Sequence, residues 1–253
     1  MYFAVVTKKK ALLILLTIIT FLIILFGSCG SAIATFSKTR ELPIYRVKTE
    51  KKQIAISFDC AWGVDYTDAL LSVMKERKVR CTFFMVEFWT EKHPEYVKKI
   101  HEAGHEIGTH SATHPYMSKL DKVAIEKELS TSTLAIEKIT GKKVEVFRPP
   151  YGDYDDLLIT TAREMGLYTI QWDVDSLDWK DLSANQIVER VTKRVKSGSI
   201  VLFHNQGKHT AEALPIVIDV LKTAGYEFVP IGELIYRDGY YMEADGSQVK
   251  NNN

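Results

Sequence analysis

The 253-residue sequence is poor in cysteine and almost neutral in charge. Three cysteines are too few for a disulfide-stapled scaffold, and 33 basic against 32 acidic residues give no charge excess that predicts a nucleic-acid partner. The motifs G-x-S-x-G, G-x-G-x-x-G and C-x-x-C and the Walker loop are absent, so a serine hydrolase or a dinucleotide enzyme has no support. No internal repeat occurs, and nothing in the sequence predicts a protein partner.

A long apolar run stands near the N-terminus. Three lysines, residues 8–10, precede residues 11–26, which are apolar apart from two threonines, and no charged residue follows until Lys38. A basic start followed by an apolar helix is typical of an export signal or a membrane anchor. We predict that residues 1–34 are a single-pass anchor with the rest of the chain outside the cytoplasm. The alternative is a secreted protein, cleaved after the A-x-A motif at residues 32–34.

The rest of the chain alternates between short β-rich runs and helical patterns. This alternation predicts a parallel α/β domain over residues 53–236, with a polar linker at 35–52 and a C-terminal tail at 237–253. Ser183 and Thr210 are predicted helix N-caps. The predicted helices are residues 67–77, 90–103, 119–140, 155–165, 183–196 and 210–224. The seven predicted strands are residues 53–59, 81–86, 106–109, 144–148, 168–174, 199–204 and 226–230.

Polar or ionisable residues stand at the ends of five of these strands, or just beyond them. A closed barrel and an open doubly wound sheet both fit the alternation, and in either the C-terminal strand ends form the functional edge. We therefore expect these side chains to converge on one rim. They are Asp59, His110, Arg148, Asp175 and His204.

Two cysteines belong to this domain. Cys60 follows the end of one predicted strand and Cys81 begins the next. If the strands are parallel neighbours, the thiols are about 15 Å apart at about 3.3 Å per residue, whereas a disulfide needs Cα atoms within about 7 Å. We therefore predict no disulfide between them.

The motif THSATH places two histidines four residues apart. On a helix this spacing puts both imidazoles of His110 and His114 on one face, but Pro115 disfavours helix and favours a turn after the strand. A tight turn also brings both rings to one ion. Two surface histidines are the alternative, and the company of the other rim residues favours metal ligands.

Two further motifs bring aromatic and rigid segments to the rim. Arg148 is followed by two prolines and Gly152, which stiffen a loop able to hold backbone N–H groups toward a substrate oxygen. The motif WDVDSLDW, residues 172–179, places Asp175 at the rim, and an aspartate that lies next to a histidine in space raises the pKa of its imidazole. Trp179 would wall an apolar pocket or stack on a sugar. A solvated acidic turn is the competing interpretation, above all for Asp178.

Five motifs in this order resemble those of the polysaccharide deacetylase family, the NodB-homology group or carbohydrate esterase family 4. The variant FD-x-x-WG also resembles the sporulation-associated PdaB-type branch. The resemblance covers roughly residues 53–234. The motifs are Ser57-Phe58-Asp59, His110-Ser111-x-x-His114, Arg148-Pro149-Pro150-Tyr151-Gly152, Asp175-Ser176-x-Asp178-Trp179 and Leu202-x-His204.

The resemblance implies a distorted (β/α) barrel of about seven parallel strands, preceded here by the N-terminal hydrophobic helix. It also implies a hydrolase that removes acetyl groups from N-acetylated cell-wall glycan, with peptidoglycan as the expected substrate. Asp59 resembles the catalytic base and Arg148 the residue that orients it. His204 resembles the general acid, tuned by Asp175.

The resemblance further implies a divalent metal, with zinc expected and cobalt as another option. His110 and His114 resemble its ligands, and a bound metal lowers the pKa of water from about 15.7 toward 7. Tyr151 resembles an oxyanion-hole donor, and Trp179 and Leu202 the walls of an acetyl pocket.

The first motif departs from the family pattern, because Cys60 stands where a metal-binding aspartate is expected. A thiolate can bind zinc beside His110 and His114. Alternatively, Asp59 binds the metal itself, Asp65 swings in from the loop, or the site holds little metal and is catalytically feeble. A buried free cysteine also serves as a small apolar filler. A catalytically weak or inactive glycan-binding or spore-structural protein with this fold therefore remains an alternative, as does an amidase or esterase for another acyl group.

Overall fold

The structure is a computed structural model that describes residues 7–29 and 40–251. The chain divides after Arg40 into two units, which are described separately. The first unit contains helix α1 (Lys8–Cys29). None of the helices in the described ranges is long and apolar enough to cross a membrane. The predicted anchor stays a prediction, and the cleavage motif at residues 32–34 lies outside the described residues.

The second unit is built on a parallel β-sheet that forms a half-barrel. Seven strands of residues 40–251 follow one another in the order β6-β5-β4-β3-β2-β8-β7, and β9 pairs with β2 beside this path. The predicted α/β barrel of about seven parallel strands is thereby confirmed. The strands are β2 (Gln53–Cys60), β3 (Thr82–Met85), β4 (Glu106–Thr109), β5 (Val146–Phe147), β6 (Tyr168–Thr169), β7 (Val174–Asp175), β8 (Ile200–His204) and β9 (Glu227–Phe228).

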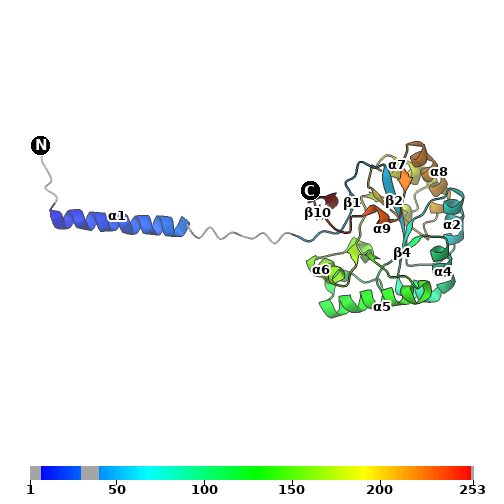
Figure 1. The fold of residues 1–253 in the computed structure, drawn as a ribbon, viewed down its shortest axis with the longest axis horizontal. Coiled ribbons are helices and arrows are strands. Elements are labelled where there is room, and N and C mark those ends of the chain that lie inside the picture. Colours follow the sequence, from blue (N-terminus) through cyan, green and yellow to red (C-terminus); the bar gives the residue numbers. More distant parts are fainter. Residues whose placement is uncertain (1–6, 30–39, 252–253) are drawn as a thin grey trace. The chain divides into compact units, whose positions relative to one another are not determined.

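Helices surround this sheet, as Figure 1 shows for α2, α4, α5, α6, α7 and α8 around the central strands. Short 3₁₀ turns lie in the connections that follow β4, β5 and β7, at Met117–Lys119, Pro150–Gly152 and Asp178–Lys180. The helices of this unit are α2 (Thr67–Glu76), α3 (Glu87–Lys92), α4 (Pro94–Glu102), α5 (Lys122–Thr140), α6 (Asp156–Glu164), α7 (Ala184–Thr192), α8 (Thr210–Thr223) and α9 (Ile231–Leu234).

Strand β2 lies at the centre of the sheet and is buried along nearly its whole length. This explains its almost continuous apolar sequence, because a parallel strand is covered on both faces. Phe58 stacks on Phe83 of β3 at 5.0 Å and on Phe203 of β8 at 5.8 Å between ring centroids. The aromatic packing fixes the end of β2, where Asp59 follows, against both neighbouring strands.

Helix ends follow the local chemistry of the sequence. The Ser183 side chain caps α7 in a reciprocal capping box with Gln186, as predicted. Thr210, the other predicted cap, is instead the first residue of α8, and its hydroxyl donates to Asp178. The predicted helix over residues 90–103 is two helices, because Pro94 lacks an N–H and begins a new one.

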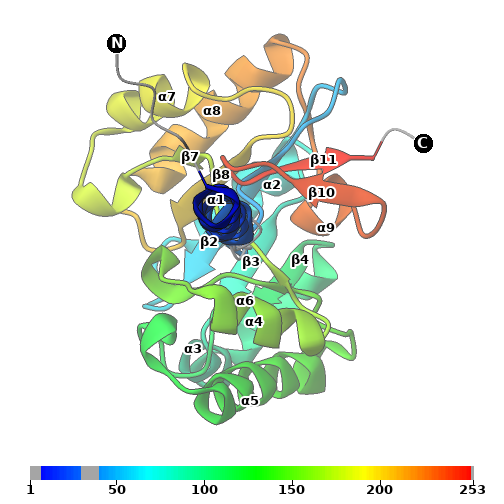
Figure 2. The same ribbon diagram turned by 90° about the vertical axis from the view of Figure 1, so that its left-hand side faces the viewer.

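The predicted linker and tail both contain strands. Strand β1 (Arg46–Val47) from the linker, with β10 (Tyr240–Met242) and β11 (Ser247–Lys250) from the tail, forms a three-stranded sheet. Figure 2 shows β10 and β11 as a hairpin, drawn in red. Val47 is fully buried, so these segments pack on the domain rather than extend from it.

The strand predicted over residues 168–174 is divided between the two edges of the half-barrel. Its first part is β6 and its last part is β7, which lie at opposite ends of the strand order. Ile170, between them, pairs with Ile44, and Arg46 pairs with Ser199, the residue before β8. Between β6 and β7 the chain therefore crosses the open side of the half-barrel. The segment before β2 pairs with residues beside both of its edges.

Candidate active site

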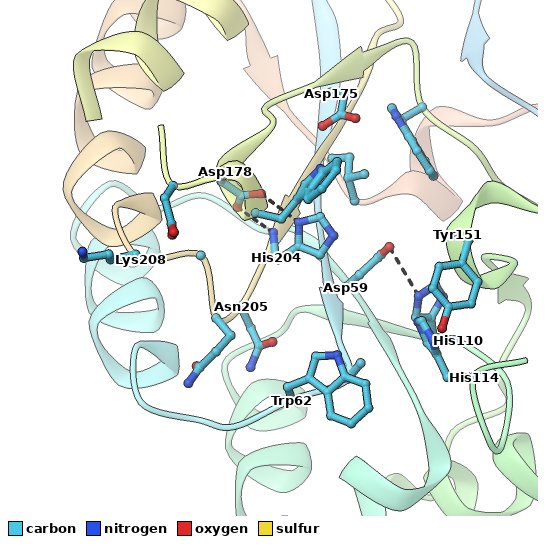
Figure 3. A pocket seen from close by; sticks show the side chains of 17 residues that line it. Asp59, Trp62, His110, His114, Tyr151, Asp175, Asp178, His204, Asn205 and Lys208 are labelled. Carbon is cyan, nitrogen blue, oxygen red and sulfur yellow. Dashed lines mark hydrogen bonds and ion pairs between the residues drawn. The ribbon is translucent and has the colours of Figure 1, made fainter. Parts of the chain in front are cut away.

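Two ionisable side chains stand opposite each other on adjacent strands. Asp59 of β2 is in register with His204 of β8, so both side chains point to the same face at the C-terminal end of the sheet. Figure 3 shows them facing one space, with His110, His114 and Tyr151 on one side and Asp178 behind His204. The predicted convergence of strand-end residues is therefore observed for Asp59 and His204 together with His110.

Asp59 is held by a buried arginine. Arg148 Nη1 donates to Asp59 Oδ1 at 2.8 Å, and the guanidinium is fully buried over the rings of Phe84 and Trp172. Burial by itself raises the pKa of Asp59, but the charges of Arg148 and the two neighbouring histidines outweigh it and leave that pKa below its ordinary value. Arg148 thus has the position predicted for it and keeps the Asp59 carboxylate ionised.

His204 is partnered by Asp178 rather than by Asp175. Asp178 Oδ1 lies 2.8 Å from His204 Nδ1, and Oδ2 accepts the His204 backbone N–H at 2.8 Å and the Thr210 hydroxyl at 2.7 Å. Burial lowers the pKa of His204, but the hydrogen bond and charge of Asp178 reverse this and raise it.

The assignment of Asp175 as the partner of His204 is therefore corrected. The Oδ1 atom of Asp175 accepts a hydrogen bond from the Leu177 N–H at 2.8 Å, so this carboxylate stabilises the local turn. Its charge contributes least among the causes named for the pKa of His204. The sequence leaves open that Asp178 is a solvated acid, but it is 1% exposed, and its contacts with the His204 ring and N–H identify it as the partner.

His110 and His114 lie together, with ring centroids 4.9 Å apart. His110 Nδ1 is 2.7 Å from the Arg148 carbonyl, which makes Nδ1 the protonated nitrogen and leaves Nε2 with a lone pair, 3.5 Å from Asp59 Oδ2. Burial lowers the pKa of both imidazoles, that of His114 to about 4. Both rings are therefore neutral near pH 7, as metal ligands must be.

The donor set suits a metal only in part. His114 Nδ1 is buried and has no hydrogen-bond partner in the described chain, which fits a ligand atom, and His110 Nε2 is free to coordinate. Cys60, the third predicted ligand, does not fit. It belongs to the apolar core, is fully buried, and does not line the pocket that Asp59 lines.

Burial, together with the charge of Asp59, raises the pKa of the Cys60 thiol well above its ordinary value. Cys60 is therefore an apolar filler, because side chains alternate along β2 and its neighbour Asp59 takes the pocket side. Among the described residues, no group of three or more His, Cys, Asp or Glu side chains is arranged to hold a metal ion. The predicted three-ligand site is thus not formed.

A cavity of about 740 Å³ opens over these groups. Tyr151, Trp179 and Leu202 line it, as expected for substrate-binding residues. Tyr151 has φ 59°, a left-handed conformation that is uncommon for a side chain of its size. Trp62 and Asn205 also line the cavity, although neither was predicted as a site residue; the available signal was a tryptophan shortly after the end of a predicted strand.

Comparison with known proteins finds similar sequences among polysaccharide deacetylases. A family model described as polysaccharide deacetylase matches residues 46–170. The peptidoglycan-N-acetylglucosamine deacetylase of Bacillus cereus is 36% identical over 196 residues, which are 76% of this chain and 92% of that protein. The protein YlxY of Bacillus subtilis is 34% identical over 76% of this chain, which spans 60% of YlxY.

A solved structure adds an unusual relative. It is a mutant, with restored enzymatic activity, of a CE4 family pseudoenzyme from Bacillus anthracis. It is 37% identical to this chain with a TM-score of 0.74, covering 76% of this chain and 70% of the other. The wild-type pseudoenzyme is 32% identical to this chain and covers 83% of it, so proteins named as deacetylases and a pseudoenzyme are both similar to this chain.

Proposed function

Because the chain belongs to the polysaccharide deacetylase family, we propose that it hydrolyses N-acetyl groups on cell-wall glycan, with peptidoglycan amino sugars as substrate. Relatives named as peptidoglycan-N-acetylglucosamine deacetylases support the substrate class. The observation that carries the proposal is the pair Asp59 and His204, in register on adjacent strands and open to one cavity. The PdaB-type branch and a link with sporulation stay predictions.

Asp59 acts as the base. Its carboxylate is kept ionised by Arg148, and an ionised carboxylate is able to take a proton from the water that attacks the acetyl carbonyl. The Asp59 Oδ1 atom is occupied by Arg148 Nη1 at 2.8 Å. Oδ2 is therefore the oxygen that receives the proton.

His204 acts as the acid. Its pKa is raised through Asp178, so the imidazolium is populated and can protonate the amine that leaves. Without that proton the tetrahedral intermediate would expel water again, because an amide anion is a very poor leaving group. The side chain of His204 is 31% exposed, which gives the leaving nitrogen access to it.

The acetyl group is oriented by the walls of the cavity. Trp179 and Leu202 give an apolar surface for its methyl group, and the backbone N–H of Tyr151 is the proposed donor to the oxyanion. The left-handed conformation at Tyr151 sets the direction of that peptide in a loop stiffened by two prolines.

A divalent ion would be held by His110 and His114. Enzymes of this family are generally metal-dependent, and when bound such an ion lowers the pKa of its water ligand. Two imidazoles without a third protein ligand predict weak binding. Zinc titration of the full chain tests this: His114→Ala should abolish binding, and the surface control His209→Ala should retain it. No zinc binding by the wild-type chain at micromolar metal would refute this part of the proposal.

Acetate release from peptidoglycan and from N-acetylglucosamine oligomers tests the catalytic proposal. Asp59→Asn should lower the rate by about 10²–10⁴-fold, the usual contribution of a general base. Asp219→Asn is the matched control, because Asp219 is an exposed acid on α8 that does not line the cavity. Equal rates in the wild type and in Asp59→Asn would show that Asp59 is not the base.

A catalytically weak or inactive glycan-binding protein is the second candidate. The position of Cys60 in the core favours it, because no third side chain there completes the metal site. The similarity to the wild-type pseudoenzyme, at 32% identity, also supports it. Glycan binding without acetate release, in the presence of zinc or cobalt, would favour this candidate.

We propose that the chain works outside the cytoplasm, where peptidoglycan lies, and that residues 1–34 hold it to the membrane. The basic residues 8–10 before an apolar stretch support this. Protease added to intact cells should then digest the domain. Protection of the domain in intact cells and its recovery in the cytosolic fraction would refute the assignment.

A further inference from the structure

Exposed aromatic side chains gather around the cavity. Trp62, Tyr116, Tyr151 and Trp179 are 65%, 57%, 59% and 56% exposed, and each lines the cavity or stacks on a residue that does. Tyr241, 49% exposed on β10, is an exposed aromatic away from it. Large apolar side chains concentrated at one open site indicate binding rather than packing.

Three of these aromatics belong to a continuous arc on one wall. Tyr116 and Tyr151 stack at 4.4 Å, and Tyr151 meets His114 at 4.6 Å between ring centroids. His114 in turn lies 6.3 Å from Trp62, which is backed by Phe88 at 5.4 Å. Trp62 thus closes one end of the arc, and most of its indole is open to solvent. In Figure 3 its ring lies beside the space that Asp59 and His204 face.

The backbone beside Trp62 is fixed although the indole is exposed. The carbonyl of the next residue, Gly63, accepts hydrogen bonds from Trp89 Nε1 at 2.7 Å and from the Asn205 side chain at 3.0 Å. Gly63 has φ 52°, and a Cβ there would stand 2.4 Å from the Gln206 amide nitrogen. The loop is therefore held against the residues that follow His204, so the backbone that carries the indole is fixed relative to the reacting groups, and Phe88 packs against the ring.

The separation between Trp62 and Asp59 suits a neighbouring sugar. Three residues span at most about 11 Å between Cα atoms, so the indole is close to the base. The cavity of about 740 Å³ lies within the range of about 300–1,000 Å³ that is usual for drug-sized ligands, so it has room for a disaccharide. An aromatic face with a fixed position covers the apolar C–H face of a pyranose ring while its edges stay wet.

We propose that Trp62 is a stacking platform for the sugar next to the one that is deacetylated, so that the site selects glycan chains over single sugars. This rests on the proposed glycan substrate but does not require catalysis. Stacking on Trp62 adds contact area for a second sugar ring and contributes nothing to the binding affinity of a monosaccharide bound over Asp59. Chain length, rather than the acetyl group, is what Trp62 then recognises.

Calorimetric titration of the full chain with an N-acetylglucosamine pentamer, and NMR titration with the monosaccharide, test the proposal. Trp62→Ala should weaken pentamer binding about tenfold, equivalent to about 1.4 kcal/mol, and leave monosaccharide binding unchanged. Trp62→Phe should restore most of the affinity because it keeps an aromatic face. Tyr241→Ala is the matched control, since it removes an exposed aromatic outside the cavity. Far-ultraviolet circular dichroism checks that each variant is folded.

The outcomes separate this inference from the catalytic proposal. Pentamer affinity unchanged by Trp62→Ala overturns the inference, even if acetate release is observed. A wild-type chain that binds the pentamer through Trp62 but releases no acetate supports the inference and counts against catalysis. A folded wild-type chain that binds no glycan overturns both.

Discussion

Replacing Asp178 by asparagine tests the central electrostatic feature of the site. The change keeps the shape of the side chain but removes its charge and one of its two acceptor oxygens. In the wild type these oxygens accept the His204 backbone N–H and the Thr210 hydroxyl, and pair with the His204 ring. At least one of these interactions must lose its acceptor. A hydrogen bond to a charged group contributes about 1.5–3 kcal/mol, so we expect the free energy of unfolding to fall by about that amount.

The pKa of His204 should fall at the same time. Burial lowers this pKa and Asp178 opposes it most strongly, so after the substitution only the weaker attractions of Asp59 and Asp175 oppose burial. Because the folded-state pKa of His204 is raised, its contribution to stability is complete below its unfolded pKa of about 6.5 and is lost as pH rises through the folded value. The destabilisation by Asp178→Asn should therefore be greater near pH 6 than near pH 9.

NMR titration of the His204 imidazole and urea unfolding at both pH values measure these effects. Asp175→Asn is the matched control, because Asp175 is the next acid in the same turn and does not touch the His204 ring. An unchanged pKa of His204 in Asp178→Asn would refute the reasoning. An equal fall in Asp175→Asn would restore the role that was predicted for Asp175.

Two further predictions concern buried groups. Arg148→Met should leave Asp59 as an uncompensated buried charge, so we expect the free energy of unfolding in urea to fall by about 3–5 kcal/mol near pH 7 and the pKa of Asp59 to rise; a loss below about 1 kcal/mol would contradict the pairing. In a Cys29→Ser chain, the thiols of Cys60 and Cys81 should not react with a disulfide reagent at pH 8 until the protein unfolds, since burial raises the pKa of both. Rapid labelling of one thiol in the folded chain would show that Cys60 is accessible and reopen its role as a ligand.

The alternation of strands and helices was predictable because it depends on local patterns. The apolar run that ends at Asp59 predicts a buried parallel strand, and β2 occupies residues 53–60 almost as expected. Strand-end residues then converge because parallel strands end at one edge of the sheet. Asp59, His110 and His204 were found in this way, without any knowledge of contacts.

Pairings across the chain were not predictable. Asp175 and Asp178 have the same charge and lie three residues apart, and only the turn at Leu177, with φ 55°, decides which one meets His204. The linker and tail likewise appeared unstructured because β1 and β11 find their partners about 200 residues away in the sequence. No local pattern contains that pairing.

The sequence by itself determined the sheet, its functional edge and the residue types that stand there, because periodicity and strand ends are local properties. The tertiary structure decided which of two aspartates faces His204, that Cys60 points into the core beside Asp59, and that Trp62 remains exposed on a fixed loop. The physical reason is that a side chain's direction depends on the strands, turns and buried hydrogen bonds around it. Residues distant in the sequence supply these.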